Sequence, residues 1–273
     1  DPGEGFQGPS TPRDELPAVR SIVIQLDGKI LTAGTFSEFA GVTRPGVARL
    51  NSDGSLDLSF EPQRDAGSVR ALALQPDGRI LVGGMLTDLY AEQLIRFHVD
   101  GALDEDFQPP YLGKILSLRV LSNGQLLVGG EASSIASPAI IRLNLDGSRD
   151  ASFEGKPFFG AAVYCLAELS DGKILAAGRF NDPNTDPGYL TGLIRLTTNG
   201  VLDPVFIRAT RTQSLTLVRA LTVQEGSSVF LGGTFGAYDD EQAARARRKP
   251  VFGVAYVWRS PDVYHWLRLG PEA

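Results

Sequence analysis

Residues 76–84 read PDGRILVGG, and this stretch separates two possible structures. A glycine-rich segment beside an apolar run is typical of a loop that holds a phosphate in front of a helix. It is equally typical of a tight turn followed by a β-strand that ends in glycine. The stretch recurs as LDGKILTAG, SNGQLLVGG, SDGKILAAG and, in altered form, EGSSVFLGG, at 26–34, 122–130, 170–178 and 225–233. A phosphate loop is a single feature, and no copy is followed by helical periodicity. The five copies therefore predict hairpins.

The rest of each repeat recurs as well. An apolar segment such as VRALALQ (69–75) precedes the turn, and a segment such as LIRFHVDGALDEDF (94–107) follows a variable loop. Asp-Gly between apolar runs indicates a β-hairpin, because both turn positions tolerate positive φ. Each repeat is therefore read as four strands, A to D, with short A–B and C–D turns. The A–B turn glycines lie 46 to 54 residues apart, and four antiparallel strands in about 50 residues are typical of a propeller blade.

The sequence thus predicts an all-β fold, a five-bladed β-propeller that occupies 1–273 as a single domain. The predicted blades are 19–60, 69–107, 115–153, 163–206 and 217–273. Residues 1–6 end in Phe like the tail of a strand D. We expect them to pair with the last blade and close the ring, which would remove the exposed sheet edges.

The combined pattern, VxxϕxxxxDGKϕϕxGG and then ϕxRLNxDGxϕDxxF (ϕ is apolar), resembles the delta-60 repeat over roughly 19–233. That family occurs in large secreted or surface proteins of bacteria and is regarded as a β-propeller. The resemblance implies a propeller module within a larger bacterial protein that is secreted or held at the cell surface. It implies no activity, since the family has no established chemistry.

An Arg in strand C and an Asp eight residues later recur across the C–D turn. The pairs are Arg49 and Asp57, Arg96 and Asp104, Arg142 and Asp150, and Arg195 and Asp203. Because the two positions face each other across a hairpin, we predict structural ion pairs; a ligand-binding role for the arginines is the alternative. In the last repeat, VAYV (254–257) aligns with strand C, and Tyr256 takes the position of the Arg.

No catalytic residue, metal site or cofactor site is predicted. Asp53, Asp100 and Asp146 lie in DG turns that weakly resemble calcium loops. A two-residue turn does not wrap far enough to supply the five or more oxygens that calcium takes, so turn chemistry is the prediction and calcium the alternative. Cys165 aligns with small residues of strand A and is predicted to be a packing residue. The single Cys and the two His leave no zinc or redox motif.

Composition limits the partners. The 273 residues carry a formal charge of −6, with 42% hydrophobic and 21% charged residues, which is a normal globular balance. A net negative charge argues against nucleic acid or an anionic membrane surface as partner. No apolar run approaches the ~20 residues of a membrane span.

The loops between strands B and C are where the repeats differ. These B–C segments have 12, 9, 9, 14 and 20 residues, whereas the DG turns keep their length. Loops on a rigid scaffold commonly carry function. The candidate binding residues come from the B–C segments of the fourth and fifth repeats: Asp182, Asp186, Tyr189, Tyr238, Asp239, Asp240 and Arg245.

We therefore expect a non-catalytic binding or scaffolding module, a monomeric domain of a larger protein, that recognises protein or glycan at the cell surface. The alternative is a glycoside-active enzyme that uses loop carboxylates, because that chemistry needs at least a pair of them.

Overall fold

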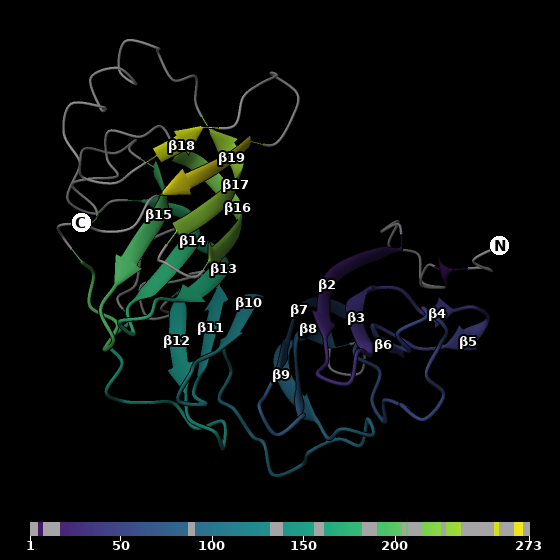
Figure 1. Cartoon of the computed structure of the whole chain (residues 1–273). Coiled ribbons are helices and arrows are strands. Elements are labelled where there is room, and N and C mark those ends of the chain that lie inside the picture. Colours follow the sequence, from purple (N-terminus) through teal and green to yellow (C-terminus); the bar gives the residue numbers. More distant parts are fainter. Residues whose placement is uncertain are drawn as a thin grey trace. The chain divides into compact units, whose positions relative to one another are not determined.

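The structure is a computed structural model that describes residues 5–7, 17–86, 91–131, 139–155, 161–181, 190–203, 206, 215–224, 228–235, 254–256 and 265–269. The elements in these ranges are strands, so the all-β prediction is confirmed (Figure 1). The chain divides into two compact units, Asp1–Val128 with Arg142–Asp150 and Gly129–Ile141 with Ala151–Ala273. The division runs through the third repeat. The described part of the chain holds no helix that is long and apolar enough to cross a membrane.

Strands A, B and C of the first four repeats form as predicted. They are β2 (Ala18–Ile24), β3 (Ile30–Thr35) and β6 (Val47–Leu50); β7 (Ser68–Leu74), β8 (Ile80–Leu86) and β9 (Ala91–Phe97); β10 (Ile115–Val120), β11 (Leu126–Gly130) and β12 (Ile140–Leu143); β13 (Ala162–Glu168), β14 (Ile174–Asn181) and β15 (Leu190–Leu196). In each set strand B pairs with strand A and with strand C, as Figure 1 shows for β13, β14 and β15; in repeat one, β3 also pairs with β7. Repeats one and two also join through one backbone pair, Thr35 with Ser68.

Strand D is shorter than predicted. In the described residues it pairs with strand C through a single bridge per repeat, for example between Phe97 and Leu103 or between Leu196 and Leu202. The chain then turns, since the Phe107 amide donates to the Asp104 carbonyl at 3.2 Å. In repeat two, strand D therefore ends at Asp104, one residue after its bridge from Leu103 to strand C.

The glycines that end strand B are explained by a bulge in strand A. The register between β7 and β8 shifts between Val69 and Ala71, and β2 and β13 shift at the equivalent point. The bulge pushes the strand A backbone toward strand B. A Cβ atom on Gly84 would overlap the Ser68 carbonyl oxygen, and Gly34 and Gly178 meet the same obstacle. The repeated glycine of PDGRILVGG thus makes room for a bulge.

The core lies between successive repeats. One cluster joins repeats one and two and includes Leu31, Phe60, Val69, Val82 and Phe97. Strand B is buried along almost its whole length, as in β3, which fits a strand covered on both faces. A second cluster joins repeats four and five and includes Leu175, Leu193, Phe206 and Leu231.

The fifth repeat departs from the predicted strand order. It contains β16 (Leu215–Gln224), β17 (Ser228–Phe235), β18 (Val254–Tyr256) and β19 (His265–Leu269), in the order β16-β17-β19-β18. The alignment of VAYV with strand C is therefore wrong, because β19 pairs with strand B instead. In this register Arg268 lies opposite Phe230, as Arg96 lies opposite Leu81 in repeat two.

The described part of the N-terminal segment pairs within repeat one, and not with the last repeat as predicted. β1 (Phe6–Gln7) pairs with β4 (Glu38–Phe39), which forms a small hairpin with β5 (Val42–Thr43) inside the first B–C segment. The Phe6 ring lies 4.4 Å from that of Phe36 and 4.8 Å from that of Phe39, between ring centroids. Apolar contact thus holds the segment to repeat one. The described strands form no closed sheet, so neither five blades nor a closed ring is shown.

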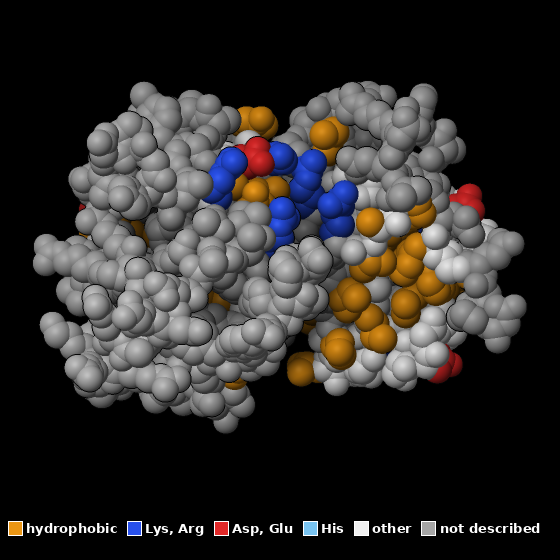
Figure 2. Space-filling view, turned by 90° about the horizontal axis from the view of Figure 1, so that it is seen from above, with side chains coloured by type: hydrophobic (Ala, Val, Ile, Leu, Met, Phe, Trp, Pro, Cys, Tyr) orange, Lys and Arg blue, Asp and Glu red, His pale blue; other side chains and the backbone are white. Residues whose placement is uncertain are grey.

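Strand A of repeat one exposes apolar side chains. Ile22 and Ile24 are 61% and 70% exposed, whereas Leu72, which corresponds to Ile22, is 6% exposed. The equivalent strand of repeat two is covered by its neighbour, and β2 has no such cover among the described residues. Figure 2 shows exposed apolar side chains gathered on one face.

Candidate functional site

The seven candidate binding residues all fall within 182–189 and 236–253. These ranges lie outside the described residues, so their predicted role stays a prediction.

The eight repeated Arg and Asp residues come together in four pairs. The Arg Nε atom donates to the Asp Oδ2 atom at 2.7 Å in Arg49–Asp57, 2.8 Å in Arg96–Asp104, 2.7 Å in Arg142–Asp150 and 3.0 Å in Arg195–Asp203. Both side chains of the Arg96 pair are about 95% buried. Backbone hydrogen bonds position the partners, since each Asp amide donates to the carbonyl of its Arg at 2.9 Å.

A phenylalanine lies against the arginine of the pairs formed by Arg49, Arg96 and Arg195. The Arg96 guanidinium lies 4.3 Å from the centroid of the Phe107 ring, and Arg49 and Arg195 lie 4.8 Å from Phe60 and Phe206. The Phe always follows the Arg by eleven residues, so this constant spacing is a signal from which the contact could have been predicted. A guanidinium over an aromatic face is attracted by the ring electrons.

The arginines also reach the next repeat. The Nη1 atom of Arg49 donates to the Val99 carbonyl at 2.6 Å, and that of Arg96 donates to the Leu145 carbonyl at 2.6 Å. Val99 and Leu145 occupy the same position of successive C–D turns. Sequence reasoning missed this contact, because a backbone carbonyl leaves no mark in a pattern of side chains.

Backbone hydrogen bonds accompany this link. The Glu61 amide donates to the Asp100 carbonyl at 3.2 Å, and the Glu154 amide donates to the Asn199 carbonyl at 2.9 Å. The chain after each of these two strands D thus contacts the next C–D turn. Arg49 and Arg96, together with these backbone bonds, therefore hold neighbouring repeats together.

Among the aspartates that pair with an arginine, Asp57 and Asp104 have lowered pKa values. Burial opposes ionisation of Asp57, but hydrogen bonds from Lys29, Ser59 and Arg49 outweigh it and hold the pKa well below its usual range. At Asp104 burial again acts against the charge, and the Arg96 guanidinium overcomes it, which lowers the pKa. Both groups are carboxylates at neutral pH and are fully engaged in the fold.

The turn aspartates bind their own turns. Asp53 accepts hydrogen bonds from the amide and hydroxyl of Ser55 at 2.9 and 2.7 Å, and Asp146 does the same with Ser148. These bonds lower the pKa of both carboxyls. Asp100 accepts from the Ala102 amide at 3.0 Å. Within the described ranges, no three His, Cys, Asp or Glu side chains group as a metal site would require.

Cys165 is held within the packed strands β13 and β16. Its thiol donates to the Arg219 carbonyl at 3.0 Å, and burial raises its pKa to about 11. A thiol with a raised pKa is a weak nucleophile at neutral pH.

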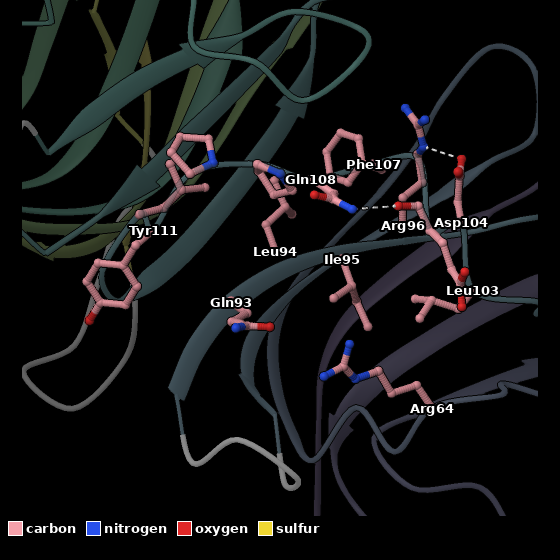
Figure 3. Close-up of a pocket in the computed structure, with 14 residues that line it drawn as sticks. Arg64, Gln93, Leu94, Ile95, Arg96, Leu103, Asp104, Phe107, Gln108 and Tyr111 are labelled. Atoms are coloured by element: carbon pink, nitrogen blue, oxygen red, sulfur yellow. Dashed lines mark hydrogen bonds and ion pairs between the residues drawn. The ribbon is translucent and has the colours of Figure 1, made fainter.

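One cavity of about 470 Å³ lies beside β9 in repeat two (Figure 3). Gln93, Leu94 and Ile95 of β9 line it, together with Arg64 and the segment after strand D. That segment contributes Phe107, Gln108, Pro109, Pro110, Tyr111 and Leu112. Sequence reasoning did not single out this place, since Arg64, Gln93 and residues 108–112 lie outside the repeated motifs.

Hairpin repeats of constant turn length, packed through shared cores and linked by Arg–Asp–Phe contacts, define a protein of the β-propeller class. The family model described as "Domain of unknown function (DUF5122) beta-propeller" matches residues 25–60, 75–107, 121–153 and 169–206. These ranges make up just over half of the chain, and the chain belongs to this family. The match confirms a β-propeller family and leaves the delta-60 resemblance as a prediction.

Among solved structures, one with a TM-score above 0.5 supports the fold. A gluconolactonase of Xanthomonas campestris, XC5397, is 13% identical with a TM-score of 0.53, over 93% of this chain and 72% of that one. A protein of unknown function from Bacteroides caccae is 17% identical with a TM-score of 0.32, over 69% and 83% of the two chains. A streptogramin B lyase is 15% identical with a TM-score of 0.43, over 81% and 63%. The comparison with curated proteins gives no match.

Proposed function

We propose that the chain is a non-catalytic binding or scaffolding module of a secreted or cell-surface bacterial protein. In this proposal a five-bladed propeller presents the B–C loops, and these bind a protein or a glycan. The observation that supports it most is how the repeated polar residues are used. Arg49 and Arg96 join neighbouring repeats, and the turn aspartates Asp53 and Asp146 bind their own turns. The repeated residues therefore serve the scaffold, and ligand recognition is left to the residues that differ.

The first B–C segment supports this division of roles. It is the one such segment that the structure describes throughout, and it forms the additional hairpin β4–β5. Strands β3 and β6 on either side keep the regular register of strands B and C. The connection between these strands thus accepts extra structure without disturbing the sheet, as a variable binding loop requires.

The candidate residues suit protein or glycan. Tyr189 and Tyr238 offer flat apolar faces, and the Asp and Arg side chains of the same segments offer hydrogen bonds in both directions. Aromatic rings with charged neighbours are typical of protein contacts and of sugar sites. The proposal needs no metal or cofactor, and it treats the chain as a monomeric domain of a larger protein.

A glycan array and a pull-down of surface proteins from the source bacterium, both with the purified chain, test the proposal. A variant with 237–249 replaced by a Gly-Ser linker should lose the ligand and keep the melting temperature. Asp53→Asn and Asp146→Asn should lower stability and leave binding unchanged. Binding that survives the loop replacement, or hydrolysis of glycosides by the purified chain, would contradict it.

A further inference from the structure

The sequence contains two Asn-Gly steps, and both lie in turns where three other repeats carry Asp-Gly. Asn123 and Gly124 belong to the A–B turn of repeat three, and Asn199 and Gly200 belong to the C–D turn of repeat four. An asparagine before glycine is prone to deamidation, because glycine has no side chain to shield its backbone nitrogen from the neighbouring side-chain amide. The two turns differ in how firmly the structure holds that nitrogen.

The turn at Asn199 is held from the preceding repeat. The Glu154 amide of repeat three donates to the Asn199 carbonyl at 2.9 Å. Gly200 is buried, and a Cβ atom added to it would lie 2.9 Å from the Gly155 nitrogen and from the Phe153 ring. The Gly200 nitrogen therefore reaches the Asn199 side chain only after contacts between two repeats have opened.

The turn at Asn123 is exposed and is closed by bonds of its own hairpin. The Gly124 amide donates to the Leu121 carbonyl at 2.9 Å, and the Leu121 amide donates to the Gln125 carbonyl at 2.8 Å. The atoms nearest to a Cβ added at Gly124 belong to the side chain of Leu145, in the same repeat. Opening of this turn breaks hydrogen bonds within one hairpin, and such local opening costs less than separation of packed repeats.

We propose that Asn123 is a site of spontaneous deamidation in the folded protein, whereas Asn199 is protected. When the turn opens, the Gly124 nitrogen attacks the Asn123 Cγ atom and forms a cyclic succinimide. The Cγ–Nδ2 bond breaks, and the amide group leaves as ammonia with the proton that Gly124 gives up. Water then opens the ring at either carbonyl, which yields aspartate or isoaspartate at position 123. The site lies outside the B–C loops, so this proposal is independent of the binding role.

The aspartate product would lack a cation that accompanies turn aspartates in repeats two and four. Arg79 Nε lies 3.7 Å from Asp77 Oδ2, and Lys173 Nζ lies 2.7 Å from Asp171 Oδ2. Repeat three has Gln125 at the position of these cations. Deamidation therefore adds a negative charge that no side chain at this position neutralises.

The same change breaks a side-chain network. The Asn123 Nδ2 atom donates to the Gln125 Oε1 atom at 2.9 Å, and Gln125 Nε2 donates to the Asp150 Oδ2 atom at 2.9 Å. Arg142 Nε donates to the same oxygen at 2.7 Å. Deamidation removes the Nδ2 donor and leaves two acceptors, a carboxylate and Gln125 Oε1, facing each other. We expect it to weaken the hold of Gln125 on Asp150, and with it repeat three.

The first test follows both sites by peptide mapping and mass spectrometry while the whole chain is kept in mildly alkaline buffer. The mass change from amide to acid should appear at Asn123 at least about tenfold faster than at Asn199, because contacts between repeats raise the cost of opening the second turn. In the chain unfolded by urea, the two sites should react at similar rates. Equal rates in the folded chain, faster reaction at Asn199, or no conversion at Asn123 while the unfolded chain converts would overturn the proposal.

The second test measures the consequence for stability. Asn123→Asp should lower the melting temperature, and it should do so less in a chain that also carries Gln125→Lys, because the lysine supplies the cation of repeats two and four. Gln125→Lys alone is the reference for that comparison, since a lysine there also lies near Asp150. An equal fall in both backgrounds, or no fall in either, would overturn the expected weakening of repeat three.

Discussion

The guanidinium of Arg49 donates to the carbonyl of Val99, fifty residues further along the chain, at 2.6 Å. The same group holds Asp57 at 2.7 Å and lies over Phe60. One side chain thus closes its own hairpin and binds the turn of the next repeat. Arg96 repeats the arrangement with Asp104, Phe107 and Leu145. Neighbouring repeats are therefore joined at their outer hairpins as well as through the apolar core.

Arg96→Ala should destabilise the protein strongly. It leaves the buried carboxylate of Asp104 without its partner and the Leu145 carbonyl without its donor. Removal of one member of a buried ion pair costs about 3–5 kcal/mol. Arg149→Ala, at an exposed position of the next hairpin, should change stability by no more than about 0.5 kcal/mol. Urea denaturation of the two variants measures the difference. Equal denaturation midpoints would contradict a structural role of the Arg96–Asp104 pair.

Acid should weaken the same contacts. The folded-state pKa values of Asp57 and Asp104 are lowered, so folding favours the ionised forms. Their contribution is present above the unfolded-state pKa, about 4 for Asp, and is lost as the pH falls through the folded-state values. The melting temperature should therefore fall on acidification below about pH 4. The difference in melting temperature between the parent and Asp57→Asn should narrow over the same pH range. A constant difference would contradict a stabilising role of the ionised Asp57 carboxylate.

The residues that the sequence could predict are those that repeat. The DG turns, the apolar runs and the eight-residue spacing of Arg49 and Asp57 follow from local rules that act in every copy. The link from Arg49 to Val99 could not be predicted, because a backbone carbonyl accepts regardless of its side chain. The place of Phe6 was also beyond the pattern. Its resemblance to the tail of a strand D is real, but burial against Phe36 and Phe39 decides where it lies.

The last repeat shows the same limit. VAYV has the alternation of a strand, and that alternation alone aligns it with strand C. The pairing of β17 with β19 joins residues from Gly233 and His265 to Val229 and Leu269, which lie more than thirty positions apart, and no local periodicity reports such contacts. The cavity beside β9 is absent from the pattern for a related reason, since Arg64 and residues 108–112 of its lining do not repeat.

Gly84→Ala should destabilise repeat two through steric overlap alone. A Cβ at Gly84 meets the Ser68 carbonyl oxygen and the Val69 Cα atom, both part of the backbone, so no side chain can move aside. Overpacking of this kind costs about 1–3 kcal/mol. Gly5→Ala places its methyl group where no atom lies within 4 Å, and it should leave the melting temperature unchanged. Equal melting temperatures of the two variants would contradict the role of the bulge.

Phe6→Ala should loosen the first B–C segment and leave the repeats intact. The Phe6 ring contacts Phe36 and Phe39, and its backbone pairs with Phe39 beside the hairpin β4–β5. Loss of the ring removes apolar contact worth about 1.5–3 kcal/mol when fully buried, and less here because Phe6 is half-buried. Amide hydrogen exchange should therefore speed up within 38–43 and stay unchanged in β7 and β8. If residues 1–6 instead complete the fifth repeat in solution, the faster exchange will appear in β16 to β19, and the pairing of Phe6 with Phe39 will have been wrong.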